Sequence, residues 1–500
     1  MATDAPQRHY RAPCPSCGAP VEFLSASAPY AVCGYCRSTV VRSGDQLKRI
    51  GRMAELFDDH SPLQLMASGR VTLDGREQPF TLVGRLQYKS DAGVWSEWIA
   101  ALDDGRTATL GEDNGSYVFT QADSGTLVPP QWAKPDVGST INVAGQSWQV
   151  AFSGAVQLIA AEGELPKLPP LGQAFNLIEL RSENGEVWSI DYGHAPPQIE
   201  RGRAVQLADL QLKGLKDESA REDAGGRSFA CPNCGAPVSV LLDSSKSCTC
   251  PSCHSVIDLS QGVGGELKAV EQSVHSTPLI PLGKVATLQG ASWQVVGYQR
   301  RQGREPGDDE SFAWSEYLLY NRERGFAFLV DAEDGWSLVH TATGAPRIDA
   351  DRKRATYLGS TYQLQSSYEA TTTEVLGEFY WPVQAGQQTA NHDYANGNNL
   401  LSTERSNGEV TTSVGSKISG QMVAEAFGLV AARQQFERQT VGPFVAAKGV
   451  GCATIILIVV ALIIVMVLVS NCSGPSGSGG GYSRSSGGSY GGYSSGGSHK

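Results

Sequence analysis

The words CPSCGAPV at residues 14–21 and CPNCGAPV at residues 231–238 decide the fold class that the sequence predicts. Each word opens a set of four cysteines, because fifteen residues separate its second cysteine from a returning CxxC pair. Two CxxC pairs at this spacing suit one tetrahedral metal ion with four thiolate ligands, as in a zinc ribbon. The sequence therefore predicts two structural zinc ions, one held by Cys14, Cys17, Cys33 and Cys36 and the other by Cys231, Cys234, Cys250 and Cys253.

Two details of these cysteine sets leave alternatives open. Iron in a rubredoxin-like site would use the same four thiolates, so iron competes with zinc. Cys248 competes with Cys250 as third ligand of the second set, but only Cys250 repeats the spacing of the first set. A site with four protein ligands has no open coordination position, which predicts a structural role and not a catalytic one.

The duplication continues past the cysteines. Trp95-Ser96-Glu97 in the first half matches Trp314-Ser315-Glu316 in the second, and NLIELRSENGEV at 176–187 matches NLLSTERSNGEV at 399–410. Short aromatic and aliphatic runs between Gly, Asn and Asp clusters are typical of strands, and Asn-Gly between two strands indicates a hairpin. We therefore predict a mainly β protein in which one unit, a four-cysteine ribbon followed by an antiparallel β module, occurs twice.

Composition shifts divide the chain further. A stripe formed by Val423, Phe427 and Val430 predicts a helix before the end of the chain, either packed on the second β module or lying on the inner membrane surface. The predicted divisions are ribbon 1 at 8–53, module 1 at 54–211, a charged linker at 212–228, ribbon 2 at 229–260, module 2 at 261–416, a juxtamembrane helix at 417–440, a transmembrane helix at 449–470 and a disordered Gly/Ser/Tyr tail at 471–500.

Residues 449–470 carry the membrane prediction. These 22 residues contain no charged side chain and are long enough to cross about 30 Å of hydrocarbon. Arg433, Arg438 and Lys448 precede the span, no signal peptide opens the chain, and eight reduced thiolates suit a reducing compartment. The expected location is a bacterial inner membrane, crossed once, with the N-terminal body cytoplasmic and the C-terminal tail outside.

The charge distribution limits the possible partners. A net charge of -11 over 500 residues argues against a general nucleic-acid binder, because binding phosphates needs a basic face. Ribbon 1 is an exception, since seven basic residues between Arg8 and Arg52 face only Glu22 and Asp45. This basic stretch indicates either an ordinary solvated surface or an anionic partner that binds ribbon 1 and not ribbon 2.

Glu97 and Glu316 are the candidates for catalysis. Each follows a tryptophan by two positions and shares a strand face with that ring, where a carboxylate can have a raised pKa. The alternative is a carboxylate satisfied by neighbouring backbone or arginine groups, and neither residue has a nucleophile paired with it. Asn391-His392-Asp393 is predicted to lie at a loop tip. No P-loop, GxGxxG, GxSxG or HExxH motif stands in a supporting context, so no catalytic or cofactor-binding residue is predicted.

The second half carries a recognisable pattern over about residues 278–384. A W-x-V-x-G strand, a W-x-E-Y-L-L-Y strand, an aromatic strand and the word G-E-F-Y-W-P resemble the bacterial family called domain of unknown function 4178. The first half is a degraded copy, in which EGELPKLP replaces GEFYWPV. The resemblance implies an accessory component of membrane-associated systems and transfers no catalytic residue. The pattern is carried by Trp293, Gly297, Trp314, Glu316, Tyr317, Tyr320, Trp336, Tyr380, Trp381 and Pro382.

These observations lead to one principal hypothesis and two alternatives. The principal hypothesis is a membrane-anchored cytoplasmic scaffold or adaptor, in which zinc-stiffened β surfaces bind a protein partner whose identity the sequence does not give. The first alternative is a membrane-associated enzyme that uses Glu316 in an aromatic-lined site. The second is binding of a nucleic acid or another anionic surface through ribbon 1, although nucleic acid is the less favoured partner. The sequence names no small-molecule ligand.

Overall fold

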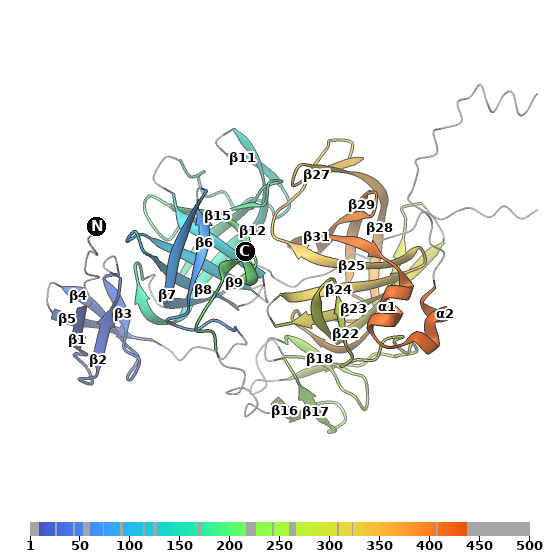
Figure 1. The fold of residues 1–500 in the computed structure, drawn as a ribbon, viewed down its shortest axis with the longest axis horizontal. Coiled ribbons are helices and arrows are strands. Elements are labelled where there is room, and N and C mark those ends of the chain that lie inside the picture. Colours follow the sequence, from blue (N-terminus) through green and yellow to red (C-terminus); the bar gives the residue numbers. More distant parts are fainter. Residues whose placement is uncertain are drawn as a thin grey trace, which may run out of the picture.

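The computed structural model describes residues 10–437 and is mainly β (Figure 1). Within that range it leaves out the short segments 26–27, 44–45, 54–60, 74, 91–93, 114–115, 124–127, 144, 169–171, 217–226, 243–244, 260–266, 308–309, 323 and 407–408.

The first half forms a two-stranded sheet, β1-β2, and a thirteen-stranded antiparallel sheet. Figure 1 shows β1 to β5 in dark blue at one end of the molecule and the rest of this half beside them. The elements are β1 Tyr10–Pro13, β2 Pro20–Phe23, β3 Tyr30–Val32, β4 Ser38–Ser43, β5 Gln46–Arg52, β6 Ser68–Leu73, β7 Arg76–Lys89, β8 Val94–Leu102, β9 Thr107–Asp113, β10 Ser116–Ala122, β11 Thr140–Val143, β12 Gln146–Leu165, β13 Ala174–Arg181, β14 Glu186–Asp191, β15 Gln198–Val205 and the 3-10 helix η1 Leu207–Leu210.

The second half repeats this plan with a two-stranded sheet, β16-β17, and a fourteen-stranded antiparallel sheet. Its elements are β16 Arg227–Ala230, β17 Pro237–Val240, β18 Ser247–Thr249, β19 Val256–Asp258, β20 Lys268–Val270, β21 Val285–Leu288, β22 Ala291–Arg304, β23 Ser311–Asn321, β24 Gly325–Ala332, β25 Gly335–Ala342, β26 Arg347–Ile348, β27 Arg354–Tyr357, β28 Ser360–Phe379, β29 Gln388–Asn396, β30 Asn399–Ser406, β31 Glu409–Ile418, α1 Gly420–Ala426, the 3-10 helix η2 Val430–Ala432 and α2 Arg433–Phe436.

Each large sheet closes on itself through one long strand. In module 1 the strands follow one another as β12-β13-β14-β15-β10-β9-β8-β7, and β12 pairs again with β7. The first part of the 20-residue β12 pairs with β13, and its last part, from Leu158 to Gly163, pairs with β7. In module 2 the equally long β28 joins β29 to β22 in the same way. The identical strand order confirms that the β unit is duplicated.

Glycines allow the closing strands to approach each other. A Cβ atom at Gly84 would lie 1.9 Å from the carbonyl oxygen of Glu164, so no other residue fits there without movement of the backbone. Gly163, which faces Gly84, has a φ of +72°, a conformation that side chains with a Cβ rarely adopt. The matched pair in module 2 is Gly297 and Gly377.

Each cysteine ribbon is joined to the sheet of its own module. In the first half β3 pairs with the end of β12, with Val32 opposite Gly163. In the second half β18 pairs with the end of β28, with Ser247 opposite Phe379. The ribbon strands β3, β4 and β5 therefore continue the module 1 sheet and end in β5, and β18, β19 and β20 do the same in module 2.

The predicted helix at 417–440 is shorter than expected and is interrupted. Val423 and Phe427 are buried against the outer face of module 2, but Gly428 then turns the chain with a φ of +67°. Val430, the third residue of the predicted stripe, is 57% exposed and begins η2. The chain closes back on the sheet at Phe436, whose carbonyl oxygen accepts a 3.0 Å hydrogen bond from the Trp336 indole.

The two halves touch at the turn between β13 and β14. The backbone carbonyl oxygen of Glu183 accepts a 2.7 Å hydrogen bond from Leu358 N, and its carboxylate lies 2.9 Å from the Arg347 guanidinium. Ser182 O accepts a further backbone hydrogen bond of 3.2 Å from Ala345. The predicted Asn-Gly hairpin turn, with Gly185 at a φ of +74°, thus also forms the contact between modules.

In the described part of the chain, no helix has both the length and the apolar character needed to cross a membrane. Its longest helix, α1, has 7 residues, whereas a membrane span needs about 20. This finding contradicts the predicted location, a single-pass bacterial inner-membrane protein with a cytoplasmic body and an outside tail. The predicted span at 449–470 and tail at 471–500 lie outside the described residues.

Candidate metal centres and buried polar sites

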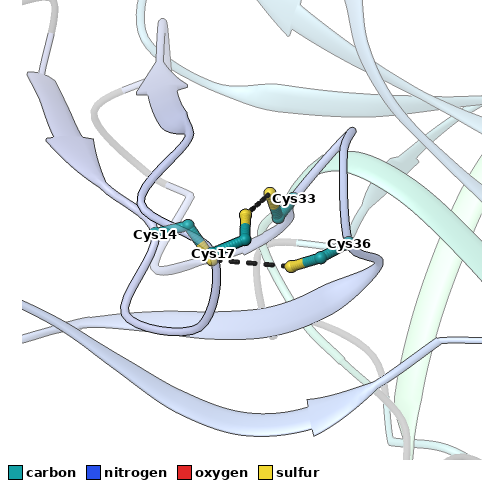
Figure 2. Close-up of side chains that lie close together, drawn as sticks. All are labelled: Cys14, Cys17, Cys33 and Cys36. Carbon is teal, nitrogen blue, oxygen red and sulfur yellow. Dashed lines mark hydrogen bonds between the residues drawn. The ribbon is translucent and has the colours of Figure 1, made fainter.

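The four cysteines of ribbon 1 converge on one point (Figure 2). The Sγ atoms of Cys14 and Cys36 are 3.7 Å apart, those of Cys17 and Cys33 are also 3.7 Å apart, and all four lie within 4.8 Å of one another. A tetrahedral ion with metal–sulfur bonds of about 2.3 Å needs sulfur–sulfur edges of about 3.8 Å, whereas a disulfide bond is about 2.05 Å long. The cluster therefore fits a four-coordinate metal ion.

The second set repeats this geometry. The Cys231–Cys253 and Cys234–Cys250 sulfur pairs are both 3.7 Å apart, within the same 4.8 Å limit. The chain thus brings together both predicted ligand sets, and each of them can hold a metal ion. Cys248 lies outside the second cluster, and burial raises its pKa to about 12, which keeps it a neutral thiol.

The local backbone of each ribbon positions the sulfur atoms. Each CxxC turn closes with a residue of positive φ, Gly18 at 77° and Arg37 at 58° in ribbon 1, and Gly235 and His254 in ribbon 2. The Ser16 N–H lies 3.4 Å from the Cys14 sulfur. Hydrogen bonds with the hydroxyl and the backbone of Ser38 lower the pKa of Cys36 to about 6, and Ser255 has the same effect on Cys253. The contacts with Ser38 and Ser255 therefore favour the thiolate of Cys36 and Cys253, which is the form that binds metal.

Two buried glutamates attach the ribbons to their modules. The Glu164 carboxylate accepts hydrogen bonds from the backbone N–H groups of Leu24 at 2.6 Å and Ser25 at 2.8 Å. Glu378 accepts from Leu241 at 2.7 Å and Leu242 at 2.9 Å in ribbon 2. Sequence reasoning missed these residues, although both follow a glycine in the matched words EGELP and GEFYW. We call Glu164 and Glu378 the ribbon clamps.

Glu378→Gln is expected to loosen ribbon 2 without unfolding module 2. The amide keeps one acceptor oxygen but turns an NH2 group toward a backbone N–H, which should cost about 1–3 kcal/mol at a buried site. Hydrogen exchange should therefore accelerate in β17 to β19 relative to β29 to β31. Glu369→Gln is the matched control, since Glu369 is exposed on the same strand. Unchanged protection of ribbon 2 in Glu378→Gln would contradict the role of the clamp.

The interior of module 2 contains a buried charge network beside its apolar core. The Glu316 carboxylate accepts 2.5 Å hydrogen bonds from the Trp314 indole and the Gln299 amide, and it lies 3.6 Å from the Arg301 guanidinium. Arg301 also donates to Glu404 at 2.9 Å and to Thr389 at 2.6 Å. Burial raises the pKa of Glu316 to about 8, with Arg301 opposing that rise. The Glu316 side chain is 0% exposed, so no substrate reaches it in this conformation.

Asn391 and Asp393 lie in this interior and not at a loop tip, so that prediction is wrong. Both belong to β29, and the turn follows later at Gly397. The Asp393 carboxylate accepts hydrogen bonds from the Tyr368 hydroxyl at 2.9 Å and the Ser402 hydroxyl at 2.6 Å. Polar residues that alternate along a strand usually face solvent, but these two side chains point inward, where they join the buried polar network beside the apolar core of module 2.

Module 1 contains a small cavity of about 20 Å³, enough for a single water molecule, where module 2 has its charge network. Glu97, the second predicted candidate, lines it and accepts a 3.2 Å hydrogen bond from the Trp95 indole. Lys167, which sequence reasoning missed, lies 2.9 Å from Glu200 at the same cavity. The remaining lining residues are Tyr88, Val156, Phe175, Leu177, Ser189 and Asp191.

Two stretches of the chain, residues 69–207 and 281–420, match the family described as "Domain of unknown function (DUF4178)". The match confirms the resemblance noted in the second half and extends it to module 1. The two stretches cover more than half of the 500 residues. No curated protein and no solved structure matches the chain.

Proposed function

The chain belongs to the family of domain of unknown function 4178, and from its two ribbon-bearing modules we propose a zinc-ribbon scaffold that binds a partner protein. Ribbon 1 is the binding element, and its ligand is an acidic segment in an extended conformation. The observation that supports the proposal is the basic strand β5, which ends the order of strands in the module 1 sheet. The ribbon clamp Glu164 binds Leu24 and Ser25 of ribbon 1 and so fixes the ribbon that carries β5 to its module.

Zinc is the metal that best suits both centres. Four thiolates at tetrahedral spacing select zinc or iron over harder ions. Zinc has no redox chemistry, so a closed four-cysteine zinc site serves folding alone. A scaffold needs a rigid ribbon and not a reactive one, and both clusters lack a position for substrate because all four ligands come from the chain.

The chemistry of β5 suits an acidic partner strand. β5 ends the order of paired strands in its sheet, so one side of its backbone offers N–H and C=O groups to an added strand. Its exposed side chains include Lys48, Arg49 and Arg52. Tyr35 is 78% exposed on the same ribbon and can pack against the partner. The matched strand β20 has three residues and one cation, Lys268, which limits the site to ribbon 1.

The test uses the metal-loaded protein and fluorescent peptides of alternating glutamate and valine. Affinity should exceed that for a matched glutamine–valine peptide and should fall as salt is added, because the contacts are exposed ion pairs. Combined Lys48→Glu, Arg49→Glu and Arg52→Glu substitution should weaken binding at least tenfold by fluorescence anisotropy. Lys268→Glu on β20 is the matched control and should leave the affinity unchanged.

Two results would contradict the proposal. Equal affinity for the acidic and the neutral peptide would mean that β5 does not select by charge. Tighter binding of single-stranded oligothymidine than of the acidic peptide would instead favour nucleic acid as the ligand of ribbon 1.

A further inference from the structure

We propose that module 2 binds a phosphate monoester group on the outer face of its sheet, through Arg352, His392 and Arg405. We call these three residues the basic patch. The patch belongs to a different module from ribbon 1, and neither the scaffold proposal nor the metal centres depend on it. The proposal is supported by a row of side chains that is polar in module 2 and apolar in module 1.

Strand pairing places four residues of module 2 in one row across the sheet. Ser367 of β28 lies opposite His392 of β29, which lies opposite Thr403 of β30. Thr403 in turn lies opposite Thr412 of β31. Asp393, the neighbour of His392, points into the buried network, so His392 and the rest of its row point to the outer face.

The matched row of module 1 is apolar. Ser153 of β12, which holds the place of Ser367 in the equally long β28, lies opposite Ile178. The row continues through Ile190 and Ile199. These isoleucines belong to an apolar cluster on which the Trp132 ring packs. Module 2 therefore has one histidine and two threonines on its outer face where module 1 has three isoleucines.

Arg405 lies beside this polar row. It follows Thr403 by two residues on β30, so both side chains leave the sheet on the same face. Module 1 has Tyr192 at the matched position, where its ring packs on Trp132 with ring centres 5.3 Å apart. Arg405 is exposed, forms no ion pair within the described part of the chain, and lies against Gly138 of module 1. The basic patch is therefore at the junction of the two modules.

Arg352 approaches the row from the turn before β27. The next residue of this turn, Lys353, accepts a 2.9 Å backbone hydrogen bond from Leu364 of β28. Arg352 has a φ of +57°, a conformation that residues with a Cβ rarely adopt. Module 1 has Gly138 at the matched position, two residues before β11, with a φ of +80°. Module 2 thus places a guanidinium here against the local backbone preference.

The groups of the basic patch lie close enough to affect one another. Burial lowers the pKa of His392, and the positive charges of Arg352 and Arg405 lower it further. Burial raises the pKa of Tyr394 to about 12, and Arg352 opposes that rise. The Tyr394 hydroxyl is buried and has no hydrogen-bond partner among the residues that the structure describes. Two cations that act on one imidazole, beside an unpaired donor, favour the binding of an anion.

Two acids lie near the basic patch. The Asp351 carboxylate accepts a 3.1 Å hydrogen bond from the backbone of its own turn. Glu369 is exposed on the same face of β28, two residues after Ser367. Within the described ranges neither acid forms an ion pair with Arg352 or Arg405. The two guanidinium groups are therefore available to an anion from outside the chain.

A phosphate monoester suits this patch better than a carboxylate does. It carries a charge of about −1.5 to −2 at neutral pH and offers three acceptor oxygens. Arginine binds phosphate through two parallel N–H···O hydrogen bonds, so Arg352 and Arg405 can engage it from two sides. The His392 ring and the Ser367 hydroxyl supply further donors between them. A carboxylate has one charge and two oxygens, which satisfy only one guanidinium.

The test measures binding of a short peptide, with one phosphoserine between glycines, to the metal-loaded full chain. Isothermal titration calorimetry at constant ionic strength should find one site per chain. Arg405→Gln should weaken binding about tenfold, because it removes a charge-assisted pair of hydrogen bonds. Arg354→Gln is the matched control and should bind as the unaltered protein does. Arg354 lies two residues from Arg352, but it forms a 2.9 Å ion pair with Asp349.

Two variants copy module 1 into the basic patch. Arg352→Gly introduces the residue that module 1 has in this turn, and glycine adopts a positive φ freely. Its stability in urea should therefore equal or exceed that of the unaltered protein, while peptide binding falls about tenfold. His392→Ile introduces the isoleucine of the matched row and should also fold and bind more weakly. Glu369→Gln removes a repelling acid and should bind more tightly.

Two further measurements assign the binding. The combined Lys48→Glu, Arg49→Glu and Arg52→Glu variant of β5 should bind the phosphoserine peptide as tightly as the unaltered protein, which separates this site from ribbon 1. Equal affinity for inorganic phosphate would assign the site to a small phosphate compound. Tighter binding of the peptide than of inorganic phosphate would assign it to a modified protein, and both results support the site.

Three results would overturn the proposal. The first is a phosphoserine peptide that gives only the heat of the matching serine peptide. The second is binding that survives the Arg352→Gly, Arg405→Gln double variant or that is lost in the β5 variant. The third is equal affinity for a glutamate peptide, which would mean that the basic patch does not select phosphate.

Discussion

Replacing Cys231 with serine is expected to remove one of two zinc ions and to unfold ribbon 2. A metal held by four thiolates contributes much of the folding free energy of so small a unit, about 10–16 kcal/mol of apparent binding energy in zinc-finger peptides. Cys14→Ser should have the same effect on ribbon 1. Mass spectrometry of the purified protein should find two zinc equivalents in the unaltered chain and one in each variant.

Cys248→Ser is the matched control for this experiment. Cys248 is buried and lies two residues before the predicted ligand Cys250, but it is outside the cluster. Its loss should therefore leave two equivalents of zinc. Hydrogen exchange should show lost protection confined to β16 to β19 in Cys231→Ser. Metal content of one equivalent or less in the unaltered chain, or mainly iron, would refute the two-zinc assignment.

Arg301→Met is expected to destabilise module 2 by about 3–5 kcal/mol, the usual cost of leaving a buried charge without its partner. Arg301 is 1% exposed, and its removal would leave Glu316 and Glu404 facing each other in a closed interior. Urea unfolding measures this loss. The triple change Arg301→Met, Glu316→Gln, Glu404→Gln should recover a large part of it, because no unpaired charge remains. Equal stability of the single and triple variants would contradict the argument.

The same network predicts how stability depends on pH. Burial raises the pKa of Glu316 from 4.5 to about 8, so between these values the folded protein binds a proton that the unfolded chain releases. The contribution of this group to stability is therefore present below about pH 4.5 and is lost as pH rises toward 8. In Glu316→Gln the unfolding free energy should fall less across this range, whereas Glu369→Gln should follow the unaltered protein. Coinciding pH profiles for Glu316→Gln and the unaltered protein would count against the raised pKa.

Repeated words in the sequence were enough to predict the ligand sets and the duplicated β unit. The WSE words lie on the equivalent strands β8 and β23, and the predicted hairpin at Asn184-Gly185 is the β13–β14 turn. The predicted match of 176–187 with 399–410 is wrong by one hairpin, because those words lie on β13–β14 and β30–β31, whereas β13 is equivalent to β29 in the strand order. These features can be predicted because they are local: the two strands of a hairpin and the turn between them are consecutive in the sequence. The four cysteines of each ribbon are also recognisable, because metal geometry restricts their spacing.

Sheet closure could not be predicted in this way. β12 pairs with β13 along its first part and with β7 along its last part, and nothing in its residues predicts a strand with two different partners that closes the sheet. Closure also buries a few polar side chains beside the apolar core, and this is why the sequence predicted Asp393 to be a loop residue. The module 1 cavity exists because Lys167 and Tyr88 stand where module 2 has Trp381 and Arg301. This difference can be recognised only when the strands of the two modules have been matched.

The ribbon clamps are made long after the ribbons that they anchor, so a ribbon cannot dock on its module until much of that module has been synthesised. Glu164 accepts a hydrogen bond from the N–H of Leu24, 140 residues earlier in the chain. Glu378 accepts one from the N–H of Leu241, 137 residues earlier. At about 5–20 residues per second, a ribosome adds the carboxylate roughly 7 to 28 seconds after the ribbon residue that it anchors. During that interval a metal-loaded ribbon can fold by itself, yet its strand β3 still lacks its neighbour β12. During synthesis the chain therefore exposes an unpaired sheet edge at β3 and later at β18. Each edge needs protection from pairing with other chains until its partner strand has been made, whereas in the folded protein both edges are paired.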